Sequence, residues 1–95
     1  FGPVEYARHD LRLAHAVDKE ELVLRLQDRA PDTIGHLSVK ELRTTDGVKY
    51  ILENDCWLLI RPSGTEPLLR VYAEGRSKTD VEVLLDYRRE VAQSA

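Results

Sequence analysis

The stretch CWLLIRPSGTEPLLRVYAEG, residues 56–75, decides the fold of this chain. It opens with a continuous apolar run over residues 56–60, which is short enough to be a buried strand. A loop bracketed by two prolines follows at residues 61–67, and beyond it apolar and polar residues alternate as far as Gly75. A loop this short joins neighbouring strands, so the stretch predicts an antiparallel pair.

The flanking segments on the N-terminal side add further strands to this pair. Residues 37–42 and 48–52 are two apolar-rich runs on either side of Thr45-Asp46-Gly47, a turn signal, so residues 37–52 read as a hairpin. Residues 6–13 alternate between polar and apolar side chains, which is typical of a half-buried strand. The sheet is therefore expected to hold four to five strands, mainly antiparallel.

Two helices complete the predicted architecture. Asp18, followed by an acidic residue three positions on, caps a helix that Pro31 ends, and Ser77 with Asp80 caps a second helix that continues to the end of the chain. Each carries an apolar stripe, so both are expected to pack on one face of the sheet. The prediction is a single α+β domain spanning residues 1–95.

Composition limits the kinds of function. The chain has 95 residues and a net charge of −3, which opposes general nucleic-acid binding because that affinity comes from many Lys and Arg contacts. The single cysteine, Cys56, cannot form an internal disulfide, and no apolar stretch approaches the roughly 20 residues that span a bilayer. We expect a soluble, cytoplasmic protein with no nucleic-acid or membrane partner.

The loop at residues 61–67 concentrates the unusual chemistry of the chain. Arg61 offers a planar guanidinium that can bind two oxygens of a phosphate, and the hydroxyls of Ser63 and Thr65 can turn to suit a tetrahedral anion. Gly64 lets the backbone turn closely and expose amides, while Arg70 could bring a second guanidinium to the same anion. These five residues are the candidate phosphate-binding set.

Plainer interpretations stay open at this point. The loop could be a simple hairpin turn flanked by surface arginines, and it is not a Walker A loop because no Gly-Lys-Ser/Thr ending is present. The other chemically versatile residues favour packing or surface roles, since none has a partner at a spacing typical of a metal or nucleophile site. They are His9, His15, His36, Cys56, Tyr50, Trp57 and Tyr72.

Residues 58–75 resemble the C-terminal signature of the α-D-phosphohexomutase superfamily, the phosphoglucomutase/phosphomannomutase type. The similarity extends weakly through residues 6–10 and 46–49. The resemblance implies a TATA-box-binding-protein-like C-terminal domain whose loop binds the phosphate of a sugar phosphate. It implies that role for Arg61, Ser63, Gly64 and Thr65, and less directly for Arg70. The flanking Trp57 and Tyr72 look closer to the phosphoglucomutase/phosphomannomutase branch than to the phosphoglucosamine branch.

The resemblance also implies a reaction for a longer protein, an intramolecular phosphotransfer classed as isomerisation. A phosphoserine in another domain would donate its phosphoryl group to a hexose phosphate, giving a bisphosphate that returns the other phosphoryl group, with Mg²⁺ bound in a domain absent from this chain. Phosphate would thereby move between positions 1 and 6 of the sugar. The implied partners are a hexose phosphate or bisphosphate and the other domains of the same enzyme.

This chain lacks the family's catalytic loops. It contains no Ser-His-Asn phosphoserine loop, no Asp-x-Asp-x-Asp metal loop and no Gly-Glu-x-Ser-Gly sugar loop, so no catalytic or metal-ligating residue is expected within it, and alone it should be inactive. The alternatives to a phosphate clamp are a structural, hinged lid without a decisive ligand contact and a nucleic-acid platform on the sheet, which the negative charge opposes.

Overall fold

The computed structural model describes residues 5–13, 18–45, 47–63 and 66–94. One strand and one helix come first along the chain, five strands follow, and two helices come last. They are β1 (Glu5–Arg12), α1 (Lys19–Asp28), β2 (Thr33–Ile34), β3 (Leu37–Arg43), β4 (Val48–Leu52), the 3₁₀ turn η1 (Glu53–Asp55), β5 (Trp57–Pro62), β6 (Leu68–Gly75), α2 (Lys78–Asp86) and α3 (Arg88–Ser94).

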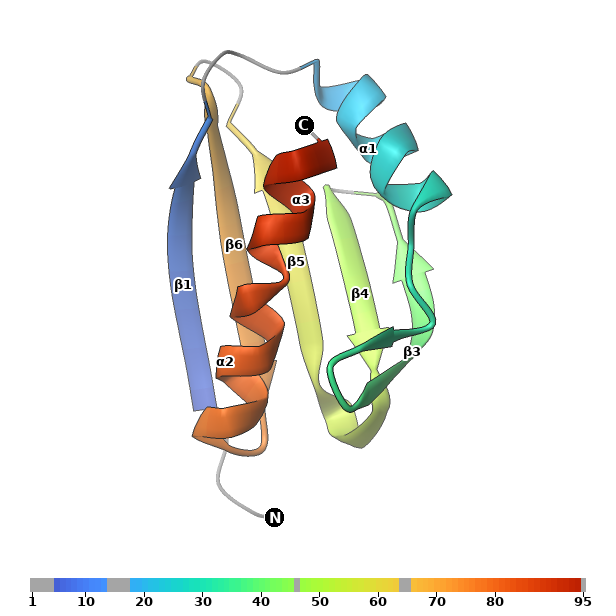
Figure 1. Cartoon of the computed structure of the whole chain (residues 1–95), viewed down its shortest axis with the longest axis vertical. Helices are drawn as coiled ribbons and strands as arrows, with labels where there is room; N and C mark the ends of the chain where they lie inside the picture. The colour runs from blue at the N-terminus through green and yellow to red at the C-terminus, as the bar shows by residue number, and fades with distance from the viewer. Residues whose placement is uncertain (1–4, 14–17, 46, 64–65, 95) are drawn as a thin grey trace.

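The strands form one antiparallel sheet in the order β1-β6-β5-β4-β3-β2 (Figure 1). The pair predicted from residues 56–75, β5 and β6, lies between β4 and β1. The first strand of the chain closes the sheet beside β6, with Glu5 opposite Gly75 and Arg12 opposite Leu68. Strands β5 and β6 are thus hydrogen-bonded on both sides, and the loop between them leaves the interior of the sheet.

All three helices cover the same face of the sheet (Figure 1), which we call the covered face. Helix α2 packs on β6, β1 and β5, whereas α1 contacts β4 and α3. Every second residue of the inner strands points into this layer, for example Leu58 and Ile60 on β5 and Val71 on β6, all with 0% of their surface exposed. Each such side chain contributes roughly 1.5–3 kcal/mol through removal of apolar surface from water.

The expected α+β class, with an antiparallel sheet and helices on one face, is confirmed. Both predicted caps form: the Asp18 carboxylate accepts from the Glu21 amide at 3.0 Å, and the Ser77 hydroxyl accepts from the Asp80 amide at 3.1 Å. The structure adds the two-residue strand β2 and divides the last helix into α2 and α3 at Tyr87. No helix in the described segments is long and apolar enough to cross a membrane.

Residues with left-handed backbone conformations form two turns, one at the end of the sheet that carries the candidate loop and one at the opposite end. In the β3–β4 turn Gly47 has φ +75°, a left-handed conformation that glycine adopts without steric cost, while Asp46 lies outside the described residues. A Cβ at Gly47 would lie 2.3 Å from the Ile60 carbonyl oxygen, so the turn packs directly on β5. At the other end of the sheet, Asn54 and Asp55 take left-handed conformations with φ 59° and 60°.

Tyr50, in the middle of the core, predicts a pH dependence of stability. Its ring is 0% exposed and meets the Tyr87 ring edge-on at a centroid distance of 5.4 Å. Burial raises the pKa of Tyr50 far above its ordinary value of 10.0, with the proximity of Tyr87 adding to the shift. Because the folded state holds this proton more tightly, its contribution is complete below pH 10 and is lost as the pH rises beyond it.

We therefore expect the free energy of unfolding to fall above about pH 10, by up to about 1.4 kcal/mol per pH unit for each such proton. Urea unfolding between pH 7 and the alkaline limit would measure the slope, and Tyr50→Phe should make it less steep. Burial also raises the pKa of the Cys56 thiol, which adds its own alkaline dependence in both proteins. An equal slope in the parent and Tyr50→Phe would contradict the assignment to Tyr50.

Candidate functional site

The candidate loop leaves the sheet between β5 and β6, at the end where the β3–β4 turn and the first turn of α1 also lie (Figure 1). Hydrogen bonds among the described residues fasten its base. The Ser63 amide donates to the Leu68 carbonyl at 2.8 Å, the Leu68 amide to the Glu66 carbonyl at 2.7 Å, the Leu13 amide to the Pro67 carbonyl at 2.8 Å and the Glu66 amide to the Ser63 hydroxyl at 3.3 Å. The base is therefore held before any ligand arrives.

Arg61 and Arg70 are directly opposite one another in the β5–β6 register. Both belong to the face away from the helices, which we call the open face, because their strand neighbours Ile60 and Val71 point into the core. Arg61 is half-buried and Arg70 is exposed. Like charges opposite one another destabilise an antiparallel pair. Negative charge close to two opposed arginines offsets their mutual repulsion.

Among the described residues, the carboxylate of Asp10 lies in the same cross-strand row. Asp10 on β1 is the register partner of Arg70, so the row runs from Asp10 through Arg70 to Arg61. Asp10 is itself in contact with Arg8, at 3.4 Å between the carboxylate and the guanidinium. The row thus brings two guanidiniums to the base of the loop, and guanidiniums suit an anion such as phosphate.

The structure places three of the five candidate residues. Arg61 and Arg70 are register partners on adjacent strands, and Ser63 lies at the base of the loop. Gly64 and Thr65 lie outside the described residues. The binding role of all five stays a prediction.

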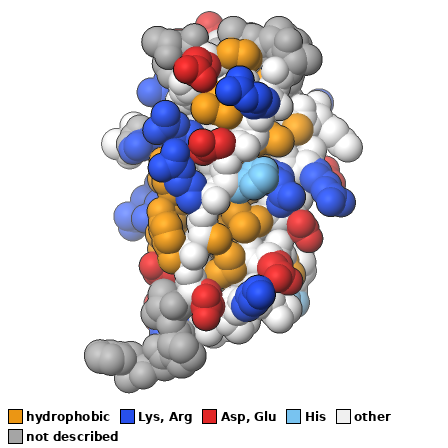
Figure 2. Space-filling view, turned by 90° about the vertical axis from the view of Figure 1, so that its left-hand side faces the viewer, with side chains coloured by type: hydrophobic (Ala, Val, Ile, Leu, Met, Phe, Trp, Pro, Cys, Tyr) orange, Lys and Arg blue, Asp and Glu red, His pale blue; other side chains and the backbone are white. Residues whose placement is uncertain are grey.

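Sequence reasoning missed how much of the open face is basic and aromatic. Arg8 lies over the Tyr72 ring at 5.7 Å, and Lys49 lies over the Trp57 ring at 4.9 Å. Figure 2, which looks onto the β1 side, shows Lys and Arg side chains gathered along one margin of the molecule beside hydrophobic ones. The period-two alternation of the strands was the available signal, but it identifies a shared face only once strand pairing is known.

The reactive side chains elsewhere have packing or surface roles. The Cys56 thiol is 1% exposed, and burial raises its pKa, which keeps it in the less reactive protonated form. His36 contacts the Asp80 carboxylate at 2.8 Å, whereas His15 lies outside the described residues. Among the residues that are described, no three His, Cys, Asp or Glu side chains group so as to hold a metal ion.

The fold and the loop define the class of protein: an α+β domain that presents an arginine pair and a Pro/Gly/Ser loop at one end of an antiparallel sheet. Residues 12–91 match the sequence model of the family described as "Phosphoglucomutase/phosphomannomutase, C-terminal domain". The chain belongs to this family of phosphohexomutase C-terminal domains.

Curated relatives agree with this assignment. The chain is 34% identical over 92 residues to the phosphoglucosamine mutase of Methanococcus vannielii, covering 82% of this chain and 20% of the relative. It is 58% identical over 40 residues to the probable phosphoglucosamine mutase of Methanosphaera stadtmanae, covering 42% of the chain and 9% of the relative. The phosphoglucomutase/phosphomannomutase of Thermococcus kodakarensis is 41% identical over 46 residues, with 48% and 10% covered.

The matched segments span between 9% and 20% of the length of these relatives. Their names include both the phosphoglucosamine and the phosphoglucomutase/phosphomannomutase types. The branch suggested by Trp57 and Tyr72 therefore remains a prediction, and these relatives are several times longer than this chain.

Proposed function

We propose that this chain is the substrate-phosphate-binding domain of a longer phosphohexomutase, and that its loop holds the phosphate that is not being transferred. Arg61, Ser63, Gly64, Thr65 and Arg70 would supply the contacts. The observation that carries the proposal is the cross-strand pairing of Arg61 and Arg70 at the base of the loop. Two guanidiniums on one face can both reach a small dianion, which offsets their mutual repulsion.

The fastened base of the loop supports the same proposal. The amide of Ser63 is bonded to Leu68, and the loop is tied to the end of β1 through Leu13 and Pro67. A site held in its bound geometry loses less conformational entropy when ligand arrives, so more of the interaction energy is available for binding. A fastened base would therefore strengthen the binding of an anion by this loop.

In the proposed enzyme the clamp positions the sugar phosphate. Contacts to the non-reacting phosphate can orient the reacting end, and phosphoryl transfer depends mainly on positioning and electrostatic stabilisation. The bisphosphate intermediate and transfer between positions 1 and 6 are part of this proposal. Mg²⁺ would be bound by another domain, and the cytoplasmic location expected from the sequence also remains a prediction.

The experiment that tests the clamp is an amide-resolved NMR titration of the ¹⁵N-labelled 95-residue chain with glucose 6-phosphate and mannose 6-phosphate. We expect weak, saturable shifts at residues 61–66, with no comparable change for unphosphorylated glucose. The reason is that phosphate contacts dominate in the proposed site, while the other domains that would surround the sugar are missing.

Arg61→Ala and Arg70→Ala should each weaken the response, whereas Arg89→Ala, an exposed residue on α3, should leave it unchanged. If signals at the loop stay fixed at millimolar sugar phosphate, the clamp proposal fails for the isolated chain. Full activity of an Arg61→Ala variant of the longer enzyme would then favour the structural, hinged-lid alternative.

A further inference from the structure

A groove with an exposed apolar side chain at its border lies between α1 and the β3–β4 turn. Its volume is about 500 Å³, and we call it the α1 groove. It is lined by Lys19, Glu20, Val23, Leu24, Thr44, Thr45 and Gly47. Leu24 is 64% exposed, so a large apolar side chain lies in water beside this depression. Removal of that surface from water would favour contact with another apolar surface.

Leu24 points away from the core of the domain. Leu22 and Leu26 are buried, and a residue midway between them lies on the opposite side of a helix with about 3.6 residues per turn. Surface helices carry polar residues on that side. Val23, which is half-buried, lines the same groove. Packing within the described core therefore does not account for a leucine at position 24.

The α1 groove adjoins the proposed clamp. Gly47, which lines the groove, packs closely on β5: a Cβ there would lie 2.3 Å from the Ile60 carbonyl oxygen and 3.2 Å from the Arg61 Cα. The first turn of α1, the β3–β4 turn and the candidate loop all lie at one end of the sheet (Figure 1). A protein surface that approaches a ligand held by Arg61 therefore also approaches the groove.

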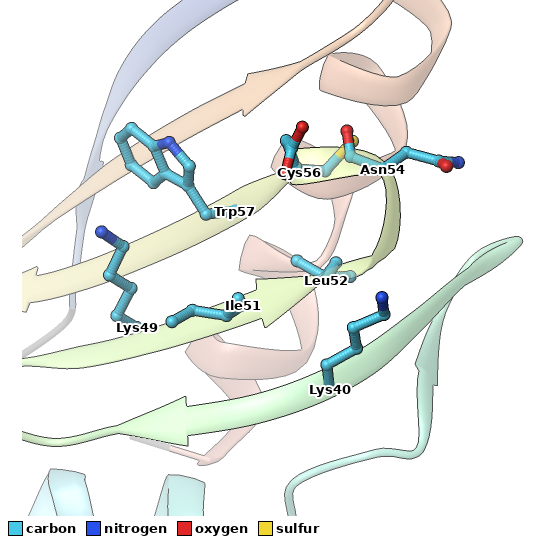
Figure 3. A pocket seen from close by; sticks show the side chains of 8 residues that line it. Lys40, Lys49, Ile51, Leu52, Asn54, Cys56 and Trp57 are labelled. Atoms are coloured by element: carbon cyan, nitrogen blue, oxygen red, sulfur yellow. The ribbon is translucent and has the colours of Figure 1, made fainter.

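The depression on the open face differs from the α1 groove in place and in chemistry. It has a volume of about 360 Å³ and lies at the opposite end of the sheet, where the Lys49 side chain turns toward Trp57 and away from Lys40 (Figure 3). The exposed Asp55 carboxylate also lines it. Its lining thus carries charges of both signs at separate places, whereas the α1 groove presents apolar side chains of one helix.

The reaction proposed for the longer enzyme brings a second domain to the loop end of this one. No catalytic residue is expected in this chain, and the matched segments cover between 9% and 20% of the relatives. The group that transfers phosphate would therefore come from elsewhere in the enzyme, and reacting atoms have to approach within roughly 3–3.5 Å. Since one sugar ring separates the clamped phosphate from the reacting oxygen, the transferring domain has to lie beside the loop.

We propose that Leu24 and the α1 groove dock against the phosphoryl-transferring domain of the same polypeptide while the loop holds the substrate phosphate. This inference rests on the proposed function. The occupant of the groove is an apolar side chain of that domain, because the charged residues of the lining, Lys19 and Glu20, have opposite signs and leave little net charge. Burial of Leu24 in the contact favours the closed arrangement and so helps to position the substrate.

Leu24→Cys makes the contact measurable by thiol labelling. Cys56 is 1% exposed and reacts slowly, and mass spectrometry assigns the label to one residue. The longer enzyme is saturated with glucose 6-phosphate, mannose 6-phosphate or glucosamine 6-phosphate, whichever it converts. We expect its Leu24→Cys thiol to react at least about tenfold more slowly than in the 95-residue chain, because a docked fraction of roughly nine-tenths leaves one-tenth accessible.

Lys78→Cys is the matched control for labelling. Lys78 is an exposed residue in the first turn of α2, at the end of the molecule opposite the loop. Its thiol should react at the same rate in the longer enzyme and in the 95-residue chain. Circular dichroism confirms that each variant is folded.

Activity gives a second readout. Leu24→Gln should lower kcat/KM of the longer enzyme about tenfold through loss of one buried apolar contact, whereas Leu24→Met, which keeps the apolar surface, should stay near the parent. In the 95-residue chain neither variant should change the melting temperature or the loop amide shifts with sugar phosphate, because Leu24 is exposed there.

Equal labelling of the Leu24→Cys thiol in the substrate-saturated longer enzyme and in the 95-residue chain would overturn the docking contact, even where loop amide shifts support the clamp. A labelling rate that falls as the 95-residue chain is concentrated would assign the groove to a second copy of the chain and would overturn the proposal too. Failure of the clamp is recognised separately, by full activity of Arg61→Ala in the longer enzyme.

Discussion

Replacing Arg61 with alanine is expected to lower kcat/KM of the longer enzyme about 100-fold, the largest functional effect that we predict for one side chain of this domain. Hydrogen bonds to charged groups contribute roughly 1.5–3 kcal/mol each, and a planar guanidinium can make two to one phosphate. Loss of about 2.8 kcal/mol corresponds to 100-fold. Steady-state kinetics with saturating and limiting hexose phosphate would measure the effect.

The division between KM and kcat carries further information. If the clamp only holds substrate, KM rises and kcat is unchanged; if its binding energy also orients the reacting end, kcat falls as well. Arg61→Lys, which keeps a charge but not the planar fork, should recover part of the loss. Arg89→Ala on α3 is the surface control. A change below about threefold for Arg61→Ala would contradict the clamp.

Gly47→Ala is expected to produce the largest loss of stability near the site, about 3 kcal/mol. Strained left-handed backbone costs roughly 1–3 kcal/mol for a residue with a side chain, and the new Cβ would also lie 2.3 Å from the Ile60 carbonyl oxygen. That obstacle is backbone in the middle of a paired strand, so it cannot rotate away. For a domain of this size we expect the melting temperature to fall by roughly 12–24 °C.

Gly47→Asn tests which of the two causes dominates. Asparagine tolerates a positive φ but still carries a Cβ, so it should remain strongly destabilised if contact with β5 is the main cost. Recovery to near the parent melting temperature would assign the cost to backbone conformation instead. Thr45→Ala, an exposed position in the same turn, is the matched control and should change the melting temperature little. Amide shifts at Arg61 would report whether the end of β5 is displaced.

Local signals in the sequence predicted the elements well. The side chains of Asp18 and Ser77 accept hydrogen bonds from amides in the first turns of the helices that they cap. Gly47 and its neighbours define a hairpin turn. The division of the last helix at Tyr87 had no such signal, because neither proline nor glycine marks it. The pairing of β1 with β6 likewise depends on contacts between segments far apart in the sequence.

For the candidate site, the sequence predicts the residue types but not their relative positions. Residue types identified Arg61, Ser63 and Arg70, since a fork of donors and a hydroxyl in one loop suit phosphate. The strand register then put Arg61 opposite Arg70, a relation that alternation alone leaves open.

The position of β5 and β6 within the sheet has a mechanical consequence for the proposed enzyme. Both strands are bonded along each of their edges, so the backbone at Arg61 and Arg70 cannot move toward a ligand separately from the rest of the sheet. Closure of the clamp onto a substrate would have to carry the whole domain as a rigid body. The freedom needed to bind the phosphate at either position 1 or position 6 of the sugar would then come from rotation of this domain relative to the other domains of the enzyme.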